Sequence, residues 1–219
     1  MKTKQTIAVI GATGNMGSAI SKGLSNGNYR LLLCANDQAK LKSLTADIKA
    51  GASAEVESVD CNVDASWEAD IIIVAVPYEA EKEVAEKIRQ VANQKIVISI
   101  ANPLNQSYDG LLTAPDTSAA EELEKLLPNS KVVKAFNTTF AADFATPVIA
   151  GKQVDAFVVG NDEDSVQTVA ELVKAVGFNP IIAGGLSVSR TLENMTLLMI
   201  QLTMKYNYNW LAGWKVLHN

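Results

Sequence analysis

Short apolar runs alternate with helical patterns along most of this chain, and this alternation limits the fold more than any other sequence feature. The runs are rich in valine, isoleucine and leucine, as strands buried on both faces are. They occupy residues 6–11, 30–35, 70–76, 95–101, 131–136, 156–160 and 180–183, with a weaker candidate at 54–60. Helical patterns lie between most of them, at 15–27, 37–50, 79–92, 119–127 and 163–176. The alternation predicts βαβ units, and therefore an α/β fold of Rossmann type with a doubly wound, mostly parallel sheet.

A glycine-rich turn follows the first apolar run. Gly11, Gly14 and Gly17 stand three residues apart, where a strand ends and a helix begins near Asn15. Unpaired backbone N–H groups at a helix start attract an anion, and glycine lets a pyrophosphate approach without meeting a Cβ atom. The turn therefore predicts dinucleotide binding, although a plain strand–helix turn has the same glycines. A Walker-type phosphate loop is excluded, because Ser18 follows Gly17 with no lysine between them.

The end of the second run is where a dinucleotide-binding fold contacts the adenosine ribose. Asp37 stands there, with Asn36 before it and Lys40 after it. A carboxylate suits the free 2′-hydroxyl of NAD, whereas a 2′-phosphate prefers an arginine, which is missing. Asp37 is an equally good cap for the helix that follows. These residues leave NAD and NADP both open.

Two later strand ends add candidates, because ligands in open α/β sheets lie beyond the carboxyl ends of the strands. Their prolines either stiffen the chain beside the nicotinamide ribose or only end the strands. The candidates are Val76, Pro77 and Tyr78 after the fourth run, and Ala101, Asn102 and Pro103 after the fifth. The irregular segment 102–118 follows, and it is long enough to be functional.

The C-terminal segment carries apolar residues at helical spacing. Charged residues interrupt it, so we expect no membrane span. We expect helices that pack on the sheet or on a partner subunit, with their apolar face formed by Leu192, Met195, Met199 and Leu202 and continued by Trp210, Trp214 and Leu217.

Composition and charge exclude other classes. The net charge of −5, with no basic run, argues against nucleic acid as a partner. Cys34 and Cys61 are too few for a disulfide framework, and we expect both to be reduced packing residues in a cytoplasmic protein without a signal peptide. The lone histidine, His218, is the next-to-last residue, so we expect no histidine-based site and no metal.

Five segments of the sequence resemble the coenzyme F420 (deazaflavin)-dependent NADP oxidoreductase family, in the order in which that family has them. The same segments resemble the cytosolic NADPH-flavin reductase domain of membrane ferric reductases. They are IGATGNMGSAI, VAVPYEA, IANPL, KVVKAFNTTFA and GGLSVSRTLENMTLLM. The resemblance implies an NAD(P)-binding Rossmann domain over 1–150 and an extension over 151–219, made of a strand, a helix, a strand and then helices, which completes the acceptor cleft. It implies hydride transfer between a nicotinamide cofactor, NADP or NAD, and a flavin or coenzyme F420.

The resemblance also implies residue roles. The pyrophosphate would be wrapped by Thr13, Gly14, Asn15 and Met16. Ala35 and Asn36 depart from the serine–arginine pair that the family often uses for the 2′-phosphate, and Lys40 keeps a basic residue nearby. Asn137 stands where the deazaflavin enzymes carry histidine, while the flavin-using relatives carry the same FNT. The acceptor-facing edge is expected at Asn137, Thr138 and Thr139, with Ala141 on the nicotinamide side.

These features predict an oxidoreductase that positions two rings and uses no catalytic acid or base of its own. We expect a small-molecule acceptor and a homodimer. One alternative is a reductase of an imine or carbonyl, because GNMGSAI also resembles pyrroline-carboxylate reductase, whose helical dimer domain is longer than residues 184–219. The other is an NAD(P)-binding redox sensor without turnover. Asn137 has an alternative role too, since an asparagine often ties a loop to the backbone.

Overall fold

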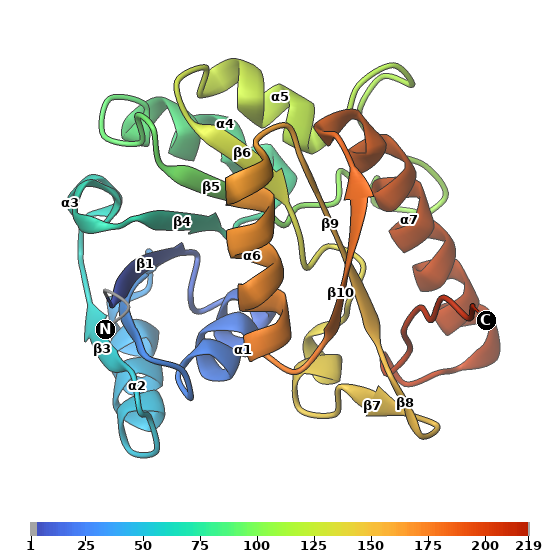
Figure 1. The fold of residues 1–219 in the computed structure, drawn as a ribbon, viewed down its shortest axis with the longest axis horizontal. Helices are drawn as coiled ribbons and strands as arrows, with labels where there is room; N and C mark the ends of the chain where they lie inside the picture. Colours follow the sequence, from blue (N-terminus) through green and yellow to red (C-terminus); the bar gives the residue numbers. More distant parts are fainter. Residues whose placement is uncertain (1–3, 219) are drawn as a thin grey trace.

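A single large sheet organises residues 4–218, the part of the chain that the computed structural model describes (Figure 1). Its strands are β1 (Gln5–Ile10), β2 (Tyr29–Cys34), β3 (Glu55–Ser58), β4 (Ile71–Val74), β5 (Ile96–Ser99), β6 (Lys131–Lys134), β9 (Asp155–Gly160) and β10 (Asn179–Gly184). The eight strands lie in the order β10-β9-β6-β5-β4-β1-β2-β3. Every neighbouring pair is parallel except β6 and β9. The predicted doubly wound, mostly parallel sheet is confirmed.

Helices connect the strands as the alternation predicts. They are α1 (Asn15–Leu24), α2 (Gln38–Lys49), α3 (Asn62–Glu68), α4 (Tyr78–Ile88), α5 (Ala119–Leu126), α6 (Glu163–Ala175) and α7 (Ser189–Tyr206), with 3₁₀ turns η1 (Ala141–Phe144) and η2 (Leu186–Val188). Side-chain oxygens of Asp37, Ser118 and Asp162 cap α2, α5 and α6. The short helix α3, the two 3₁₀ turns and the small hairpin of β7 (Val148–Ile149) and β8 (Lys152–Gln153) were not predicted.

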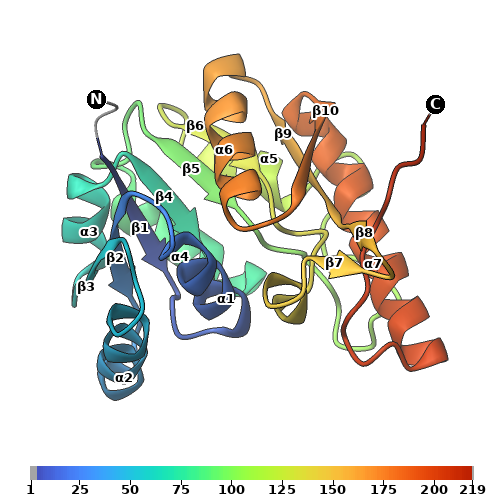
Figure 2. The same cartoon turned by 60° about the horizontal axis from the view of Figure 1, so that its bottom comes forward.

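The sheet separates two apolar layers because successive side chains of a strand point to opposite faces. Ile7 and Val9 of β1 belong to the layer beneath α1, α2 and α6. Ala8 and Ile10 of the same strand belong to the layer beneath α3, α4 and α5. Figures 1 and 2 show the two groups of helices on opposite faces. Burial on both faces explains why these strands read as continuous apolar runs.

One edge of the same sheet is formed by β9 and β10, which α6 connects. Helix α7 follows, and Leu192 and Met199 of its predicted apolar face are buried. The division into domains at residue 150 stays a prediction.

Residues 207–218 form no helix, so the predicted continuation of an apolar helix face through Trp210, Trp214 and Leu217 is wrong. Asn207 ends α7 in the left-handed conformation, with φ 55°. The chain then turns back, and Trp214 pairs with Asp155 at the start of β9. Trp214 packs beside Leu192 in a third apolar cluster. Tertiary contacts, rather than helical periodicity, therefore place these aromatic side chains.

The irregular segment 102–118 agrees with its prediction, whereas one of the two cysteines does not. Segment 102–118 is irregular as predicted, with an isolated bridge between Leu104 and Leu111. Cys34 is buried, but Cys61 is exposed ahead of α3, so its role as a packing residue is wrong. No helix within residues 4–218 has the length and apolar character needed to cross a membrane.

Candidate functional site

The three glycines of the turn differ in what an added Cβ atom would meet. Gly11 adopts φ +86°, and a Cβ atom there would clash with the Ala75 carbonyl. A Cβ atom on Gly17 would clash with the Gly11 carbonyl, because α1 packs closely on the turn. At Gly14, by contrast, the nearest atom to an added Cβ would be the Gly11 carbonyl oxygen at 3.3 Å. Gly11 and Gly17 are therefore needed for the fold, whereas a Cβ atom at Gly14 would make a tight contact but no clash.

Gly14 is also the N-cap of α1 and supplies no side-chain acceptor to the first turn of the helix. No acidic residue occupies that first turn. The backbone N–H groups and the positive end of the helix dipole thus face an exposed position free of carboxylates. This cradle fits a pyrophosphate, as the sequence predicts.

A groove of ≈ 330 Å³ leads from one side of this turn across the ends of β1, β2 and β4. β1 pairs with both β2 and β4, so the groove lies where the strand order reverses, which is the usual ligand site of open α/β sheets. Predicted site residues that line it are Gly11, Thr13, Gly14, Ala35, Asn36, Asp37, Val76 and Pro77. The fold therefore brings together candidates from three separate strand ends.

The polar end of this groove contains more charges than the sequence suggested. Asp37 Oδ1 accepts a hydrogen bond from the Lys40 backbone N–H at 3.0 Å, which lowers the pKa of Asp37. Lys40 Nζ lies 3.3 Å from Asp37 Oδ2. Lys87 of α4 also lines the groove and pairs with Glu83 at 2.5 Å. Sequence reasoning missed Asn62, Glu83 and Lys87, although Ala80, Val84 and Lys87 recur at helical spacing.

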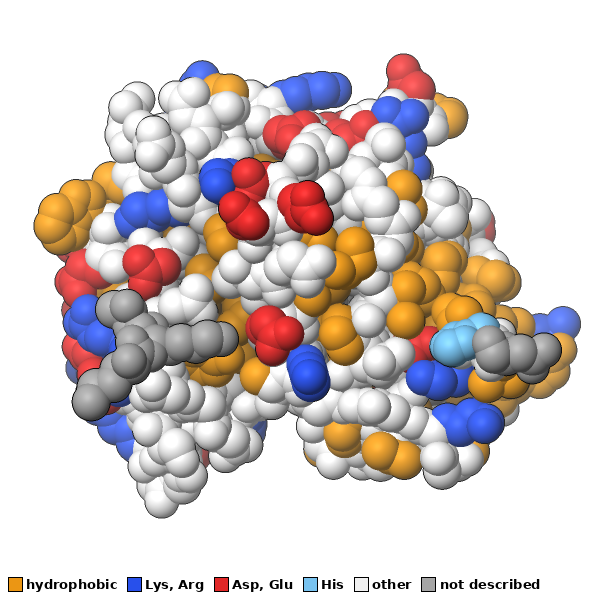
Figure 3. Space-filling view, in the orientation of Figure 1, with side chains coloured by type: hydrophobic (Ala, Val, Ile, Leu, Met, Phe, Trp, Pro, Cys, Tyr) orange, Lys and Arg blue, Asp and Glu red, His pale blue; other side chains and the backbone are white. Residues whose placement is uncertain are grey.

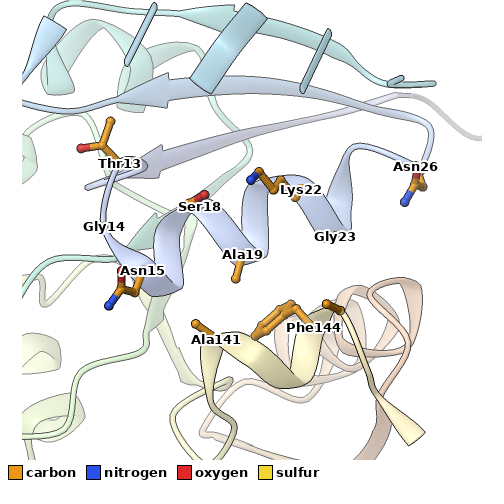
Figure 4. Close-up of a pocket in the computed structure, with 11 residues that line it drawn as sticks. Thr13, Gly14, Asn15, Ser18, Ala19, Lys22, Gly23, Asn26, Ala141 and Phe144 are labelled. Atoms are coloured by element: carbon orange, nitrogen blue, oxygen red, sulfur yellow. The ribbon is translucent and has the colours of Figure 1, made fainter. Parts of the chain in front are cut away.

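A second groove, of ≈ 490 Å³, leaves the other side of the glycine turn and runs between α1 and η1 (Figure 4). It shares Thr13 and Gly14 with the first groove and reaches the predicted nicotinamide-side residue Ala141. The residues that sequence reasoning missed here are Ser18, Ala19, Lys22, Gly23, Asn26, Phe144 and Ala145. For the residues of α1, the sign in the sequence is that small and polar residues recur every three or four positions.

Asn137, the first of the predicted acceptor-side residues, ties three segments together. Its Nδ2 donates to Asn102 Oδ1 at 3.0 Å, and Asn102 Nδ2 donates to the Asn137 carbonyl at 3.0 Å. Thr196 Oγ1 of α7 donates to the same carbonyl at 2.9 Å. The loops after β5 and β6 and the middle of α7 are thereby joined. An alternative role predicted from the sequence is that Asn137 ties its loop in place. These hydrogen bonds agree with that role.

Two polar atoms in this region have no hydrogen-bond partner within residues 4–218. They are Asn137 Oδ1 and Thr138 Oγ1, and both side chains are buried, as is Thr139. Phe136, just before them, adopts φ 62°, which is unusual for a residue other than glycine. Buried acceptors without partners and a strained backbone are typical of ligand sites, so these residues fit a bound ring with polar edges.

A buried group of charges lies behind the fifth strand end. Lys134 Nζ lies 2.7 Å from Glu193 Oε1 and donates to the Ala101 carbonyl at 2.8 Å. Ala119 N–H, at the start of α5, donates to Glu193 Oε1 at 3.0 Å. Glu81 is buried nearby, and its burial raises its pKa to about 8. This group of charges was not predicted from the sequence. The only sign of it in the sequence is a charged residue within an apolar strand or on an apolar helix face.

Several predicted residues take other positions. Tyr78 begins α4 and donates from its hydroxyl to Glu122 Oε2 at 2.6 Å, toward α5 rather than into the first groove. Its burial and Glu122 raise the pKa of the Tyr78 hydroxyl. Met16, Gly17 and Lys40 do not line the first groove. Ala101 and Pro103 are buried beside the Asn102 contact.

Comparisons with known proteins agree with this geometry. The family model described as "NADP oxidoreductase coenzyme F420-dependent" matches residues 6–103. The chain is 32% identical over 213 residues to the F420-dependent NADP reductase of Methanocaldococcus jannaschii, covering 91% of this chain and 93% of that protein. It is 32% identical over 148 residues to human metalloreductase STEAP2, covering 67% of this chain and 28% of that protein.

One solved structure has the same fold over nearly the whole chain. It is a putative F420-dependent NADP reductase from Arthrobacter sp. FB24, with a TM-score of 0.85 and 22% sequence identity. The match covers 98% of this chain and 100% of that one.

Proposed function

This chain belongs to the coenzyme F420-dependent NADP oxidoreductase family, and from that premise we propose that it transfers hydride between NADPH and coenzyme F420. The F420-dependent NADP reductase of Methanocaldococcus jannaschii matches it over nearly its full length. The observation that carries the proposal is the meeting of two grooves at Gly14, with a carboxylate-free helix start between them.

The two grooves suggest where each part of the dinucleotide binds. Its pyrophosphate lies on the backbone of Thr13 to Met16, where the start of α1 offers N–H groups. Its adenosine lies in the groove lined by Asn36, Asp37 and Pro77. Its nicotinamide extends past Asn102 toward Ala141. When bound, the nicotinamide supplies the hydride and the deazaflavin ring accepts it.

The chain's own contribution is position and exclusion of water. Asn137, Asn102 and Thr196 hold three segments in fixed relation beside the expected nicotinamide. A rigid, dry site is what hydride transfer between two stacked rings requires, and no protein acid or base has to act. Asn137 Oδ1 and Thr138 Oγ1 are buried without hydrogen-bond partners among the described residues, and a ring edge that reaches them would supply those partners.

Two lysines are candidates to bind the 2′-phosphate of NADP, in place of the missing arginine. Lys40 lies four residues after Asn36, in the first turn of α2, and Lys87 lines the groove from α4. Each now pairs with an exposed carboxylate of its own helix or helix cap, Asp37 and Glu83 respectively. Exposed pairs of this kind are weak, so a doubly charged phosphate can take over either lysine.

We further propose that the chain forms a cytoplasmic homodimer. Apolar side chains gather over β10, α7 and the C-terminal segment (Figure 3). Exposed members are Ile182, Leu198, Met204, Tyr206, Trp210, Leu211, Val216 and Leu217. A patch of this kind is typical of an interface. Light scattering should give twice the chain mass, and Leu198→Glu should give the single mass; a wild-type monomer would contradict the dimer. Both cysteines are free thiols, as a reducing compartment favours.

Anaerobic turnover with defined acceptors tests the hydride-transfer proposal. NADPH should be oxidised in step with the loss of oxidised-deazaflavin absorbance. FMN, FAD and a cyclic imine serve as alternative acceptors in parallel assays. Preferred reduction of the imine would support the carbonyl and imine reductases instead. Binding of NADPH without turnover of any acceptor would support a sensor.

A further inference from the structure

We propose that the groove between α1 and η1 binds an anionic side chain carried by the acceptor. The inference rests on the proposed function, because it assigns a subsite for the same acceptor. Coenzyme F420 fits this chemistry, since a flexible chain joins its ring to a phosphate and to glutamate carboxylates. Phosphate and carboxylate groups are recognised by the same donors, so the shared chemistry defines the subsite.

The position of the groove favours an extension of the acceptor. One end of the groove is Gly14, where the pyrophosphate is expected, and its far wall is η1, which begins at Ala141 (Figure 4). A ring stacked on the nicotinamide would lie near Ala141. A chain leaving that ring can continue along α1 without crossing the adenosine groove, which lies on the other side of Gly14.

The lining of the groove is suited to an anion. Lys22 is its one charged residue, and no carboxylate lines it. The other polar groups are the amides of Asn15 and Asn26 and the hydroxyls of Ser18 and Thr13, all of which can donate hydrogen bonds. Asn15, Ser18 and Lys22 recur every three or four residues, so α1 presents them as one stripe, and Asn26 follows just after the helix ends. Figure 4 shows Ala19 and Phe144 on opposite sides of the groove, where they can contact the carbon chain.

Lys22 differs from the other cations near the ligand site. Lys40 and Lys87 each pair with a carboxylate, and so does the buried Lys134. Lys22 has no ion pair with any residue in the range 4–218. The chain has a net charge of −5, yet Lys22 has no carboxylate partner among the described residues and lines a groove without carboxylates. Its ammonium group is therefore free to bind an anion from a ligand.

The test compares two deazaflavins that differ only in the anionic side chain. One is coenzyme F420, and the other is the same ring with its sugar-alcohol chain but no phosphate or glutamate. Lys22→Gln should raise the KM for coenzyme F420 by about five- to tenfold, because one charge-assisted contact is lost. The KM for the uncharged deazaflavin and the KM for NADPH should not change. Salt should raise the wild-type KM for coenzyme F420 and have little effect in the variant.

Two further variants make the test specific. Asn26→Asp places a carboxylate in the same groove and should raise the KM for coenzyme F420 alone. Lys42→Gln removes an exposed lysine of α2 that does not line the groove, and it should change nothing. Thermal melts of all variants establish that each one folds.

The outcomes separate this inference from the proposed function. Reduction of both deazaflavins with an unchanged KM for coenzyme F420 in Lys22→Gln would overturn the subsite and leave the function standing. An equal rise in the KM for NADPH would also overturn it, because Lys22 would then contact the dinucleotide. Failure of wild-type protein to reduce either deazaflavin would remove the proposed function and the subsite together.

Discussion

The ammonium group of Lys134 lies 2.7 Å from the carboxylate of Glu193, and both side chains are fully buried. Lys134 is in β6 and Glu193 is in α7, so the pair joins the sheet to the C-terminal helix. Lys134 also contacts the Ala101 carbonyl, and Glu193 contacts the start of α5. These extra hydrogen bonds offset part of the desolvation that makes buried ion pairs costly. The pair therefore fixes four segments around the expected nicotinamide site.

Removing one member of the pair should destabilise the fold strongly. Glu193→Gln leaves Lys134 buried without its counter-charge, and we expect a loss of about 3–5 kcal/mol in the free energy of unfolding. The double variant Lys134→Met, Glu193→Leu removes both charges and should recover most of that loss. Urea unfolding curves measure both effects. A loss below about 1 kcal/mol in Glu193→Gln would show that the pair is not important for stability.

Glu81 should make stability depend on pH. Burial, together with Glu193 and Glu122, raises its pKa to about 8 against the opposing effect of Lys134, whereas the unfolded value is near 4.5. The folded state thus holds a proton that the unfolded state releases between these two pH values. Stability must fall as pH rises through this window, by at most about 1.4 kcal/mol per pH unit, and level off above the folded pKa.

The control for this effect is Glu81→Gln, which cannot titrate. The difference in unfolding free energy between wild-type protein and Glu81→Gln should shrink or change sign as pH rises from 5 to 9, in steps of about one unit. A difference that stays constant over this range would mean that Glu81 is ionised throughout.

Gly14→Val should abolish NADPH binding and leave the fold intact. Gly14 has φ −71° and ψ 166°, which valine adopts readily, and an added Cβ atom would make one tight contact, 3.3 Å from the Gly11 carbonyl oxygen, that a small shift relieves. The branched side chain would occupy the space of the pyrophosphate. Titration calorimetry and a thermal melt give the two readouts. Gly17→Ala is the contrasting variant, since its Cβ would clash with the turn and lower the melting temperature. Wild-type affinity in folded Gly14→Val would place the site elsewhere.

Asn36→Arg should improve NADPH binding by about 1 to 2 kcal/mol through a charge-assisted contact with the 2′-phosphate. NADH binding should change little, because NADH has no such phosphate. Lys40→Gln and Lys87→Gln should act in the opposite direction on NADPH alone. The measurement is the ratio of the two dissociation constants in each variant. A wild-type preference for NADPH of about a thousandfold, unaffected by Asn36→Arg, would contradict this assignment.

Asn137→Ala should slow acceptor reduction and leave NADPH binding nearly unchanged. The variant loses the hydrogen bond from Asn137 Nδ2 to Asn102 Oδ1 and the partnerless Oδ1, while the dinucleotide is held mainly at the first two strand ends. We expect kcat/KM for the deazaflavin to fall by about tenfold or more. Turnover should also survive a metal chelator. Weaker NADPH binding with unchanged acceptor kinetics would reverse the roles assigned to these residues.

Local patterns in the sequence determined most of the fold. Strands buried on both faces appear as continuous apolar runs, and helices between them show apolar residues at their own spacing, so β1, β2, β4 to β6, β9 and β10 could be predicted. The glycine turn was equally clear, because the need for Gly11 and Gly17 is local to the turn and the first helix. Helix α3 was missed because seven residues are too few to show a periodic face.

The sequence alone determined the strand–helix alternation, the glycine turn and the family, because these depend on residues close together in the chain. Tertiary structure alone decided which charges meet. Lys134 and Glu193 belong to separate apolar segments, and nothing local to either one marks the other as its partner. Lys22 became a groove residue only when η1 packed beside α1. Such contacts join positions far apart in sequence, and their free energy comes from burial that exists only after the sheet and its helices have packed.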